Sequence, residues 1–497
     1  MTSGSPSAGR DRAVGLLCAL AAFLGALSWA VLTPPFQAPD EPSHFAYVQR
    51  LAETGTPPSP AETERPPWSS EQAAALRAIE FPAVRSNPFG KPPWTVEQQR
   101  LADRELAAEL PQDDGGGAEA SATYPPLYYS LEAVPYLAFD ALGANVLERL
   151  AAMRALSALL TGLTVLFIFM FIRQLLPGTA LAAPTGALGV GLLPYVSFIG
   201  ASVNNDVLMM LLAAILFWLL ARSFRLGIRP WAGAGIAAVL VAGWATKPTL
   251  LGLAPGALLA VAVLLLRSWR ADRTNALRSM AAFAGAGVAV AAVYLGITQG
   301  LWNRTSQPPP PRQFVSGGEG VGQKERSLGG LLSYAWQYWL PRLPFLTDQV
   351  PEPYPLWETM FKGFVGRFGW LEYQFPAWVY WMALAAWAAL VALAARALVM
   401  SRALLRSRGA EALCYLVMAG GVLMLISAVG YDLRLNGDSF EQARYLFPLL
   451  ALIGGLIGLA VKGAGRRLAP YLAVTIVVGA GFLNVAGLLL TLGRYYA

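Results

Sequence analysis

Long apolar runs separated by short polar stretches recur along almost the whole chain. Each run has about 18 to 25 residues, which matches the roughly 30 Å hydrocarbon thickness of a bilayer at 1.5 Å per helical residue. Eleven runs predict membrane-spanning helices, at residues 13–33, 152–172, 179–199, 206–224, 231–247, 249–266, 279–300, 377–399, 411–430, 445–461 and 469–491. The pattern therefore predicts an all-α fold, a polytopic transmembrane helical bundle.

The composition supports a lipid environment. Of the 497 residues, 56% are hydrophobic and only 13% are charged, which leaves too little polar surface to cover a soluble globule of this size. The net charge of +7 is spread over short loops between the runs and forms no single basic patch, so we expect a lipid bilayer and no nucleic acid as partner. Cys18 and Cys414 lie inside apolar runs, where a small hydrophobic role is favoured over a disulfide.

The distribution of basic residues predicts the topology. Pro125 to Leu142 is also apolar, but it carries two prolines at its start and the acids Glu132 and Asp140. If this segment does not cross, the most basic short loops all lie on the N-terminal side, which the positive-inside rule makes cytoplasmic. These loops contain Arg222, Arg225 and Arg229; Arg267, Arg270, Arg273 and Arg278; Arg402, Arg406 and Arg408; and Lys462, Arg466 and Arg467. We therefore interpret Pro125 to Leu142 as a juxtamembrane helix at the outer interface.

This topology divides the chain into five parts. They are a cytoplasmic tail with the first span (1–33), a first outer loop (34–151), a transmembrane bundle (152–300), a second outer loop (301–376) and a C-terminal bundle (377–497). Within the first outer loop we expect a helix that ends near Gly55 and amphipathic helices at 70–79 and 96–110.

Two acids directly follow the first span. Asp40 and Glu41 stand next to Pro42 at the predicted start of a helix, where carboxylates are good capping residues. His44, the only histidine, is four residues after Asp40 and three after Glu41, and such neighbours share one face of a helix. A functional site is therefore the alternative to simple capping.

At these residues the chain resembles GT-C glycosyltransferases, which include protein O-mannosyltransferases and aminoarabinose transferases. Those enzymes have a long first outer loop that opens with Asp-Glu, and Tyr124-Pro125-Pro126-Leu127-Tyr128-Tyr129 is similar to the juxtamembrane element that closes it. A closer resemblance, over nearly the whole chain, is to a family of bacterial GT-C-like membrane proteins without an assigned activity. The shared motifs are Asp40-Glu41-Pro42-Ser43-His44-Phe45, Ser202-Val203-Asn204-Asn205-Asp206, Lys247-Pro248-Thr249, Gly369-Trp370-Leu371-Glu372 and Arg444-Tyr445-Leu446-Phe447-Pro448.

The resemblance implies an inverting transferase on the outer face of a bacterial plasma membrane. It would move a sugar from a polyprenyl-phosphate donor to a glycan, lipid or protein acceptor. A single displacement needs one carboxylate that removes the acceptor proton, and Asp40 is our first choice. Glu41 is the second choice, or it orients the acceptor or a cation.

The leaving phosphate departs ionised and needs positive charge, for which Lys247 and Arg444 are the candidates. The alternative for Lys247 is snorkelling to the interface, and for Arg444 an ordinary flanking charge or a pair with Glu441 or Asp438. Arg149 and Arg154 are further phosphate candidates. Additional substrate-binding candidates are His44, Tyr124, Asn205, Asp206 and Tyr445, although Asp206 could instead cap the span that it begins.

Other chemistries lack support in the sequence. One histidine and two cysteines in apolar runs provide no His/Cys metal site, and no Walker lysine motif is present. No cofactor is assigned, but Asp40, Glu41 and Asp206 could support a divalent cation. The competing hypotheses are a transporter or flippase for lipid-linked glycans and a polysaccharide polymerase or ligase. Transporters usually gather polar residues at the bilayer midplane, whereas here they gather at one face.

Overall fold

The computed structural model describes residues 6–59, 65–86, 95–117, 121–302, 327–346, 350, 355–435 and 442–496. Almost all regular structure is helical. The bundle contains α1 (Pro6–Leu32), α7 (Val146–Leu175), α8 (Ala182–Gly191), α9 (Pro194–Gly200), α10 (Asp206–Leu226), α11 (Pro230–Trp244), α12 (Ala254–Ala271), α13 (Arg273–Leu295), α16 (Ala377–Met400), α18 (Gly409–Leu435), α19 (Leu450–Gly463) and α20 (Gly465–Tyr495).

Shorter elements connect and flank these helices. The α-helices among them are α2 (Glu41–Thr54), α3 (Ser70–Ala78), α4 (Phe81–Ser86), α5 (Val96–Leu106), α6 (Leu127–Asp140), α14 (Leu328–Trp339), α15 (Lys362–Gly366) and α17 (Arg402–Ser407). The 3-10 turns are η1 (Ser121–Thr123), η2 (Pro248–Leu253) and η5 (Ala443–Leu449), and the π turns are η3 (Gly296–Leu301) and η4 (Leu356–Phe361).

Each of the eleven predicted runs forms a helix. Among the described residues, nine helical segments are long and apolar enough to cross a membrane. A tenth run is split into α8 and α9, which meet at an angle of 65° where Pro194 begins the second half. The eleventh, α11, is apolar but has only 15 residues. The predicted all-α polytopic bundle is therefore confirmed, and the expected outer helices at 70–79, 96–110 and up to Gly55 correspond to α3, α5 and α2.

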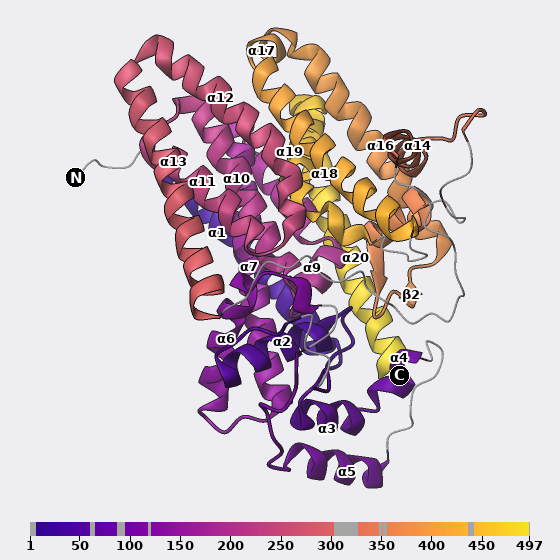
Figure 1. Ribbon diagram of the computed structural model, residues 1–497. Coiled ribbons are helices and arrows are strands. Elements are labelled where there is room, and N and C mark those ends of the chain that lie inside the picture. Colours follow the sequence, from indigo (N-terminus) through magenta and orange to yellow (C-terminus); the bar gives the residue numbers. More distant parts are fainter. Residues whose placement is uncertain are drawn as a thin grey trace.

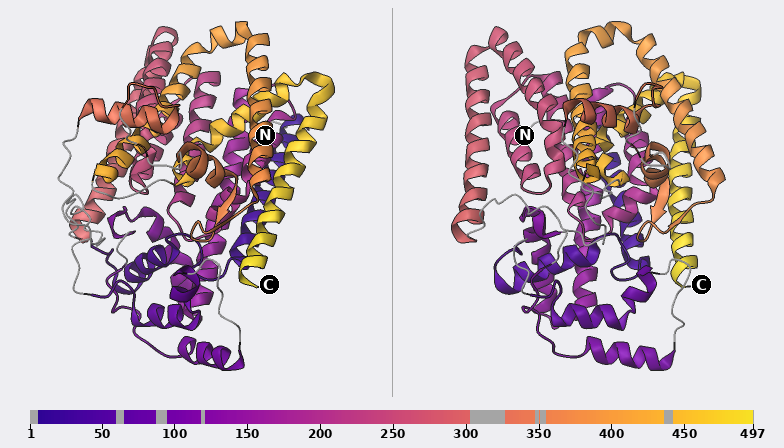
Figure 2. Two further views of the ribbon diagram at one scale, coloured as in Figure 1. Left: turned by 90° about the vertical axis from the view of Figure 1, so that its right-hand side faces the viewer. Right: turned by 45° about the vertical axis from the view of Figure 1, so that its right-hand side comes forward.

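The two ends of the bundle are chemically different. Elements α2 to α6 gather at one end together with the C-terminus, while the α12–α13 turn and α17 lie at the opposite end (Figures 1 and 2). Contacts at that opposite end join segments that the charge pattern assigns to one side: Arg173 pairs with Asp11, and Asn275 Nδ2 donates to the Ile228 carbonyl at 2.9 Å.

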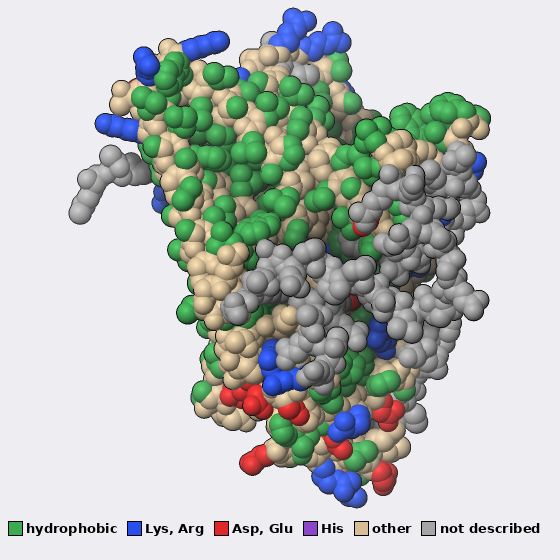
Figure 3. Space-filling view, viewed as in Figure 1, with side chains coloured by type: hydrophobic (Ala, Val, Ile, Leu, Met, Phe, Trp, Pro, Cys, Tyr) green, Lys and Arg blue, Asp and Glu red, His purple; other side chains and the backbone are tan. Residues whose placement is uncertain are grey.

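The visible surface has the zonation of a membrane protein. In Figure 3 the charged side chains visible at the end with the α12–α13 turn and α17 are basic, and a broad band of mostly apolar surface follows. The end with α3 and α5 carries both acids and bases. Exposed apolar side chains such as Val288, Trp381 and Val478, each more than 60% exposed, belong to helices of this band. Lipid is the environment that makes this exposure favourable.

Within the described residues a two-stranded hairpin interrupts the helical structure, and the sequence pattern did not predict it. Strands β1 (Arg367–Phe368) and β2 (Tyr373–Gln374) are antiparallel. The motif Gly369-Trp370-Leu371-Glu372 forms their turn, in which Gly369 and Leu371 have positive φ. Glu372 pairs with Arg494 near the end of α20 at 3.3 Å, so this motif fixes the hairpin to the last helix.

Close helix packing depends on glycines at points where two backbones meet. A Cβ on Gly421 in α18 would lie 2.1 Å from the carbonyl oxygen of Gly252 in η2. A Cβ on its neighbour Gly420 would meet no atom within 4 Å. Small residues at such contacts allow the close backbone approach on which helix association in membranes relies.

We expect Gly421→Ala to lower the thermal unfolding temperature of the detergent-solubilised protein. The added methyl must push α18 away from η2, and overpacking of this kind costs about 1–3 kcal/mol. The matched control Gly420→Ala should leave the unfolding temperature unchanged or raise it slightly. Equal losses in both variants would contradict the packing that the structure has at this contact.

Candidate functional site

Four charged side chains meet at the end of the bundle that carries α2 and α6. Lys247 Nζ donates to Asp206 Oδ1 at 2.6 Å, Arg444 Nε lies 3.4 Å from Asp206 Oδ2, and Arg444 also pairs with Asp40. We call Asp40, Asp206, Lys247 and Arg444 the charged quartet. Asp206, Lys247 and Arg444 are at most 4% exposed, whereas the Asp40 side chain is 33% exposed. Asp40 is therefore the member of the quartet that solvent or a ligand reaches most easily.

The backbone of Asp40 turns its carboxylate toward Arg444. Asp40 precedes the first turn of α2 in a left-handed conformation (φ 62°), and its side chain makes no capping hydrogen bond. Aspartate tolerates this conformation better than most residues, but strain of this kind persists only where the surroundings enforce it. The Asp40 side chain thus pairs with Arg444 and does not cap α2.

Asp206 lies at the first turn of α10 and is likewise directed to the quartet. Its backbone N–H donates to Asn204 Oδ1 at 3.0 Å, and both carboxylate oxygens of Asp206 face cations. Asn205 is fully buried beside it. The two predicted residues therefore lie at the site, and Asp206 is an ion-pair partner there.

Both cations lie at short 3-10 turns that directly precede a spanning helix. Lys247 immediately precedes η2, and Arg444 is inside η5; each turn contains a proline. Lys247 Nζ is 5.4 Å from the ring centroids of both Tyr124 and Tyr445, a favourable cation–π distance. Since Lys247 is buried and paired, it does not snorkel to the interface.

Arg444 is paired with two acids far away in the chain. Its described partners, Asp40 and Asp206, are not the neighbours that its sequence context offers as an alternative. Those neighbours, Asp438 and Glu441, lie outside the described residues.

The charges of the quartet act on the basicity of Asp40. Burial alone would raise the pKa of the Asp40 carboxyl, but the nearby positive charges, above all that of Arg444, lower it below the usual value. Asp40 is therefore ionised at neutral pH. A ligand that drew Arg444 away would weaken this effect and make the carboxylate a stronger base.

His44, in the first turns of α2, is buried and neutral. Its Nδ1 shares a 2.9 Å hydrogen bond with the hydroxyl of Tyr129, and its ring is nearly parallel to that of Tyr124. Burial lowers the pKa of His44 to about 3. His44 therefore positions the aromatic side chains Tyr124 and Tyr129 around the quartet and is uncharged at neutral pH.

Glu41 points away from the quartet into a buried ion pair. Arg154 Nε and Nη2 donate to its two carboxylate oxygens at 2.8 and 2.6 Å, and the Val203 N–H adds a third hydrogen bond at 3.2 Å. Arg154 also donates to the carbonyl oxygen of Thr33 at the end of α1. These contacts occupy both oxygens of Glu41, so the geometry favours Asp40 over Glu41 as a base and removes Arg154 from the phosphate candidates.

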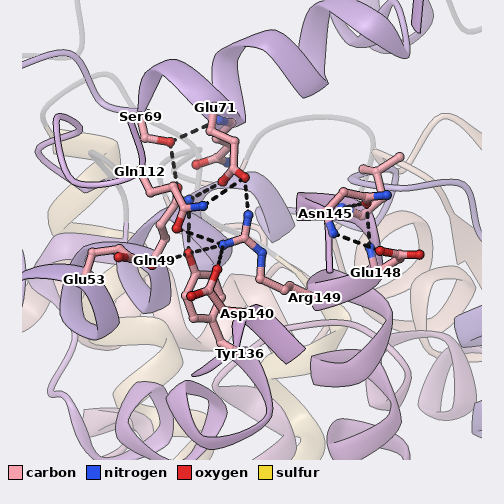
Figure 4. Close-up of polar contacts among 12 residues, drawn as sticks. Gln49, Glu53, Ser69, Glu71, Gln112, Tyr136, Asp140, Asn145, Glu148 and Arg149 are labelled. Carbon is pink, nitrogen blue, oxygen red and sulfur yellow. Dashed lines mark hydrogen bonds and ion pairs between the residues drawn. The ribbon is translucent and has the colours of Figure 1, made fainter. Parts of the chain in front are cut away.

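Arg149 belongs to a separate network, shown in Figure 4. Its guanidinium is fully buried, pairs with Glu71, and donates to Asp140 and to the Tyr136 hydroxyl, each at 2.8 Å. Gln49 Nε2 joins the network through Glu71 at 2.8 Å. Arg149 therefore fastens α3 to α2, α6 and α7, and it is not part of the quartet.

A second buried chain of hydrogen bonds supports the site without a clear signal in the sequence. The Asn204 N–H donates to the Tyr128 hydroxyl at 2.7 Å, that hydroxyl lies 3.1 Å from Ser157 Oγ, and Ser157 donates to Glu132 at 2.9 Å. Burial raises the pKa of Glu132 to about 8, so this carboxyl is mostly protonated at pH 7. Only the position of Glu132 in an apolar run hinted at a special role.

The acids at the site do not converge as metal ligands do. In the part of the chain that the structure describes, no group of three or more His, Cys, Asp or Glu residues is placed to hold a metal ion. Asp40, Asp206 and Glu41 each face a basic side chain, so positive charge at the site comes from Lys247 and Arg444.

The fold and the site define a polytopic, all-helical membrane protein with buried ion pairs at one end of its bundle. The model of the family described as predicted membrane protein (DUF2142) matches residues 23–453, which include the entire charged quartet. The chain belongs to this family. No curated protein and no solved structure matches it.

Glu41→Gln should destabilise the fold much more than Asp40→Asn. The first change leaves the buried Arg154 guanidinium without its counter-charge, which costs about 3–5 kcal/mol. Asp40→Asn leaves Arg444 still facing Asp206 Oδ2 at 3.4 Å, so the loss of Asp40 should cost less. Thermal unfolding of the two variants in one detergent checks this expectation, and equal unfolding temperatures would contradict it.

The pH profile of stability should reveal the buried Glu132. Its pKa rises from 4.5 to about 8 on folding, so the native protein keeps a proton that the unfolded chain releases. The stabilisation is complete below pH 4.5 and is lost as the pH rises toward 8. Glu132→Gln, which does not titrate, should therefore lose less stability between pH 5 and 8 than the wild type.

The exposed Glu97→Gln variant is the control for this measurement. His44 contributes its own pH dependence, but it does so equally in all three proteins, so the difference isolates Glu132. Parallel profiles for the wild type and Glu132→Gln would show that Glu132 is not held in its neutral form.

Proposed function

We propose that this protein is an inverting membrane glycosyltransferase that moves a sugar from a polyprenyl-phosphate donor to an extracytoplasmic glycan, lipid or protein acceptor. The observation that carries the proposal is the pairing of a partly exposed carboxylate, Asp40, with the buried Arg444. Among the described residues, Nη1 of Arg444 donates no hydrogen bond, so this cation has capacity left for an anionic ligand. A base and an anion-binding group are thus held side by side.

The two groups fit the two demands of the reaction. An acceptor hydroxyl attacks the anomeric carbon, its proton passes to the Asp40 carboxylate, and the bond between that carbon and the phosphate oxygen breaks. The lipid phosphate leaves as an anion, and Arg444 and Lys247 stabilise the charge that develops on it. When the phosphate takes up the charge of Arg444, the pKa of Asp40 rises, which improves the base at the moment it is needed.

The location of the quartet supports an outward-facing site in a plasma membrane. The end of the molecule opposite the quartet carries the arginines of the α12–α13 turn and α17. By the positive-inside rule that end is cytoplasmic, and the quartet then lies at the outer interface. A polyprenyl phosphate embedded in the outer leaflet would present its headgroup at the same depth.

One feature favours a second candidate, a transporter or flippase of lipid-linked glycans. The break between α8 and α9 resembles the discontinuous helices that transporters use at their substrate sites. The charged groups, however, lie where spanning helices begin at one end of the bundle, which suits a surface reaction better than passage through the midplane.

Asp40→Asn should abolish sugar transfer to below about 1% of the wild-type rate, since general-base catalysis typically contributes 10²–10⁴-fold. The measurement is transfer from radiolabelled polyprenyl-phosphate sugars by protein purified into lipid nanodiscs. The control is Asp103→Asn on the exposed surface of α5, which should retain full activity.

Lys247→Ala and Arg444→Ala should raise the apparent KM for the donor more than that for the acceptor. Full transfer by Asp40→Asn would remove the proposed base. Movement of the intact sugar lipid across the membrane by the wild type, with no covalent transfer, would support the flippase instead.

A further inference from the structure

Neutral polar groups without hydrogen-bond partners surround the charged quartet. Tyr195 and Asn205 are both fully buried. Among the described residues, neither the Tyr195 hydroxyl nor either polar atom of the Asn205 amide has a hydrogen-bond partner. Asn205 directly precedes Asp206, so its amide belongs to the turn that supplies one acid of the quartet.

Tyr195 reaches the quartet from the broken helix. It is the second residue of α9, directly after the break, and its ring packs on Phe447 of η5 with centroids 5.7 Å apart. Phe447 is three residues beyond Arg444. The Tyr195 ring thus packs against the turn that carries Arg444, and its hydroxyl lies within electrostatic range of Arg444, Asp206 and Asp40.

A buried hydroxyl and amide without partners destabilise a protein, because they lose their hydrogen bonds to water and gain none in return. Phenylalanine and leucine would fill the same space without that loss. Three unsatisfied polar atoms beside one ion-pair cluster therefore indicate a ligand that completes their hydrogen bonds. The chemistry of that ligand follows from theirs: a phenol and an amide are uncharged and can both donate and accept, which suits sugar hydroxyls better than a phosphate.

We propose that Tyr195 and Asn205 form a neutral subsite that binds hydroxyl groups of the sugar on the donor lipid. The inference rests on the proposed function and assigns the sugar and the phosphate to different residues. Arg444 and Lys247 hold the phosphate, while Tyr195 and Asn205 read the ring that is transferred. They are specificity-determining residues, and the break between α8 and α9 is what brings Tyr195 into place.

The test compares polyprenyl phosphates with and without an attached sugar. Binding of undecaprenyl phosphate alone is measured beside binding of undecaprenyl phosphomannose, undecaprenyl phosphoglucose and decaprenyl phosphoarabinose, by microscale thermophoresis in nanodiscs. For each sugar lipid that the wild type binds, Tyr195→Phe and Asn205→Ala should each weaken binding about three- to tenfold, the effect of one lost hydrogen bond. Neither change should alter binding of undecaprenyl phosphate.

Thermal unfolding separates this role from a structural one. Because no described residue forms a hydrogen bond with the Tyr195 hydroxyl, Tyr195→Phe should leave the unfolding temperature unchanged or raise it. The matched control is Tyr128→Phe, which removes a hydroxyl bonded to Ser157 and to the Asn204 N–H and should lower the unfolding temperature.

The outcomes distinguish the two proposals. If the wild type binds a sugar lipid and both variants bind it equally well, the sugar subsite is wrong and the proposed function stands. If both variants lose undecaprenyl phosphate and sugar lipid to the same extent, the groups hold the phosphate and the subsite is again wrong. If the wild type binds none of the four lipids, the proposed function fails, and the sugar subsite fails with it.

Discussion

The pairing of opposite charges in a place from which water is largely excluded is the constraint on which this structure depends. Asp206, Lys247 and Arg444 are buried at the end of an apolar bundle, and each would be costly there without a counter-charge. The Asp40–Arg444 pair joins residues 404 positions apart and so connects the segment between α1 and α2 to η5. The segments α1–α2, α10, η2 and η5 must therefore meet at one place. The position of the site follows from that requirement.

Two further networks fix the elements next to Asp40. Glu41 and Arg154 fix the residue next to it against the ends of α1 and α7, and Arg149 fastens α3 beneath α2 and α6. The two adjacent acids therefore have different environments. Both carboxylate oxygens of Glu41 are occupied by the buried ion pair with Arg154, which stabilises the fold. The Asp40 carboxylate is partly exposed and is accessible to a ligand. A rigid frame around one accessible carboxylate fits the proposed transfer from a lipid donor.

Hydropathy and charge predicted most of the architecture, since the length of a span and the side of a basic loop follow from local sequence. The resemblance to GT-C glycosyltransferases, together with positions at the ends of spans, selected Asp40, Asp206, Lys247 and Arg444 as candidates. Sequence patterns could not predict which charged side chains form ion pairs. Arg154 was a phosphate candidate and is instead the partner of Glu41, 113 residues away. Tyr195 gave no signal at all, because one tyrosine in an apolar run looks like ordinary core. Its position depends on the 65° bend between α8 and α9, which only the three-dimensional packing reveals.

We propose that the charged quartet performs sugar transfer. It is tested most directly by following both halves of a donor with the purified wild-type protein in nanodiscs. The donor carries one isotope in the polyprenyl phosphate and another in the sugar, and a membrane extract supplies the acceptors. If the protein transfers the sugar, one free polyprenyl phosphate is released for every sugar that becomes covalently attached to an acceptor, with inversion at the anomeric carbon. Donor that stays intact, or crosses the membrane with both labels still joined, would contradict it.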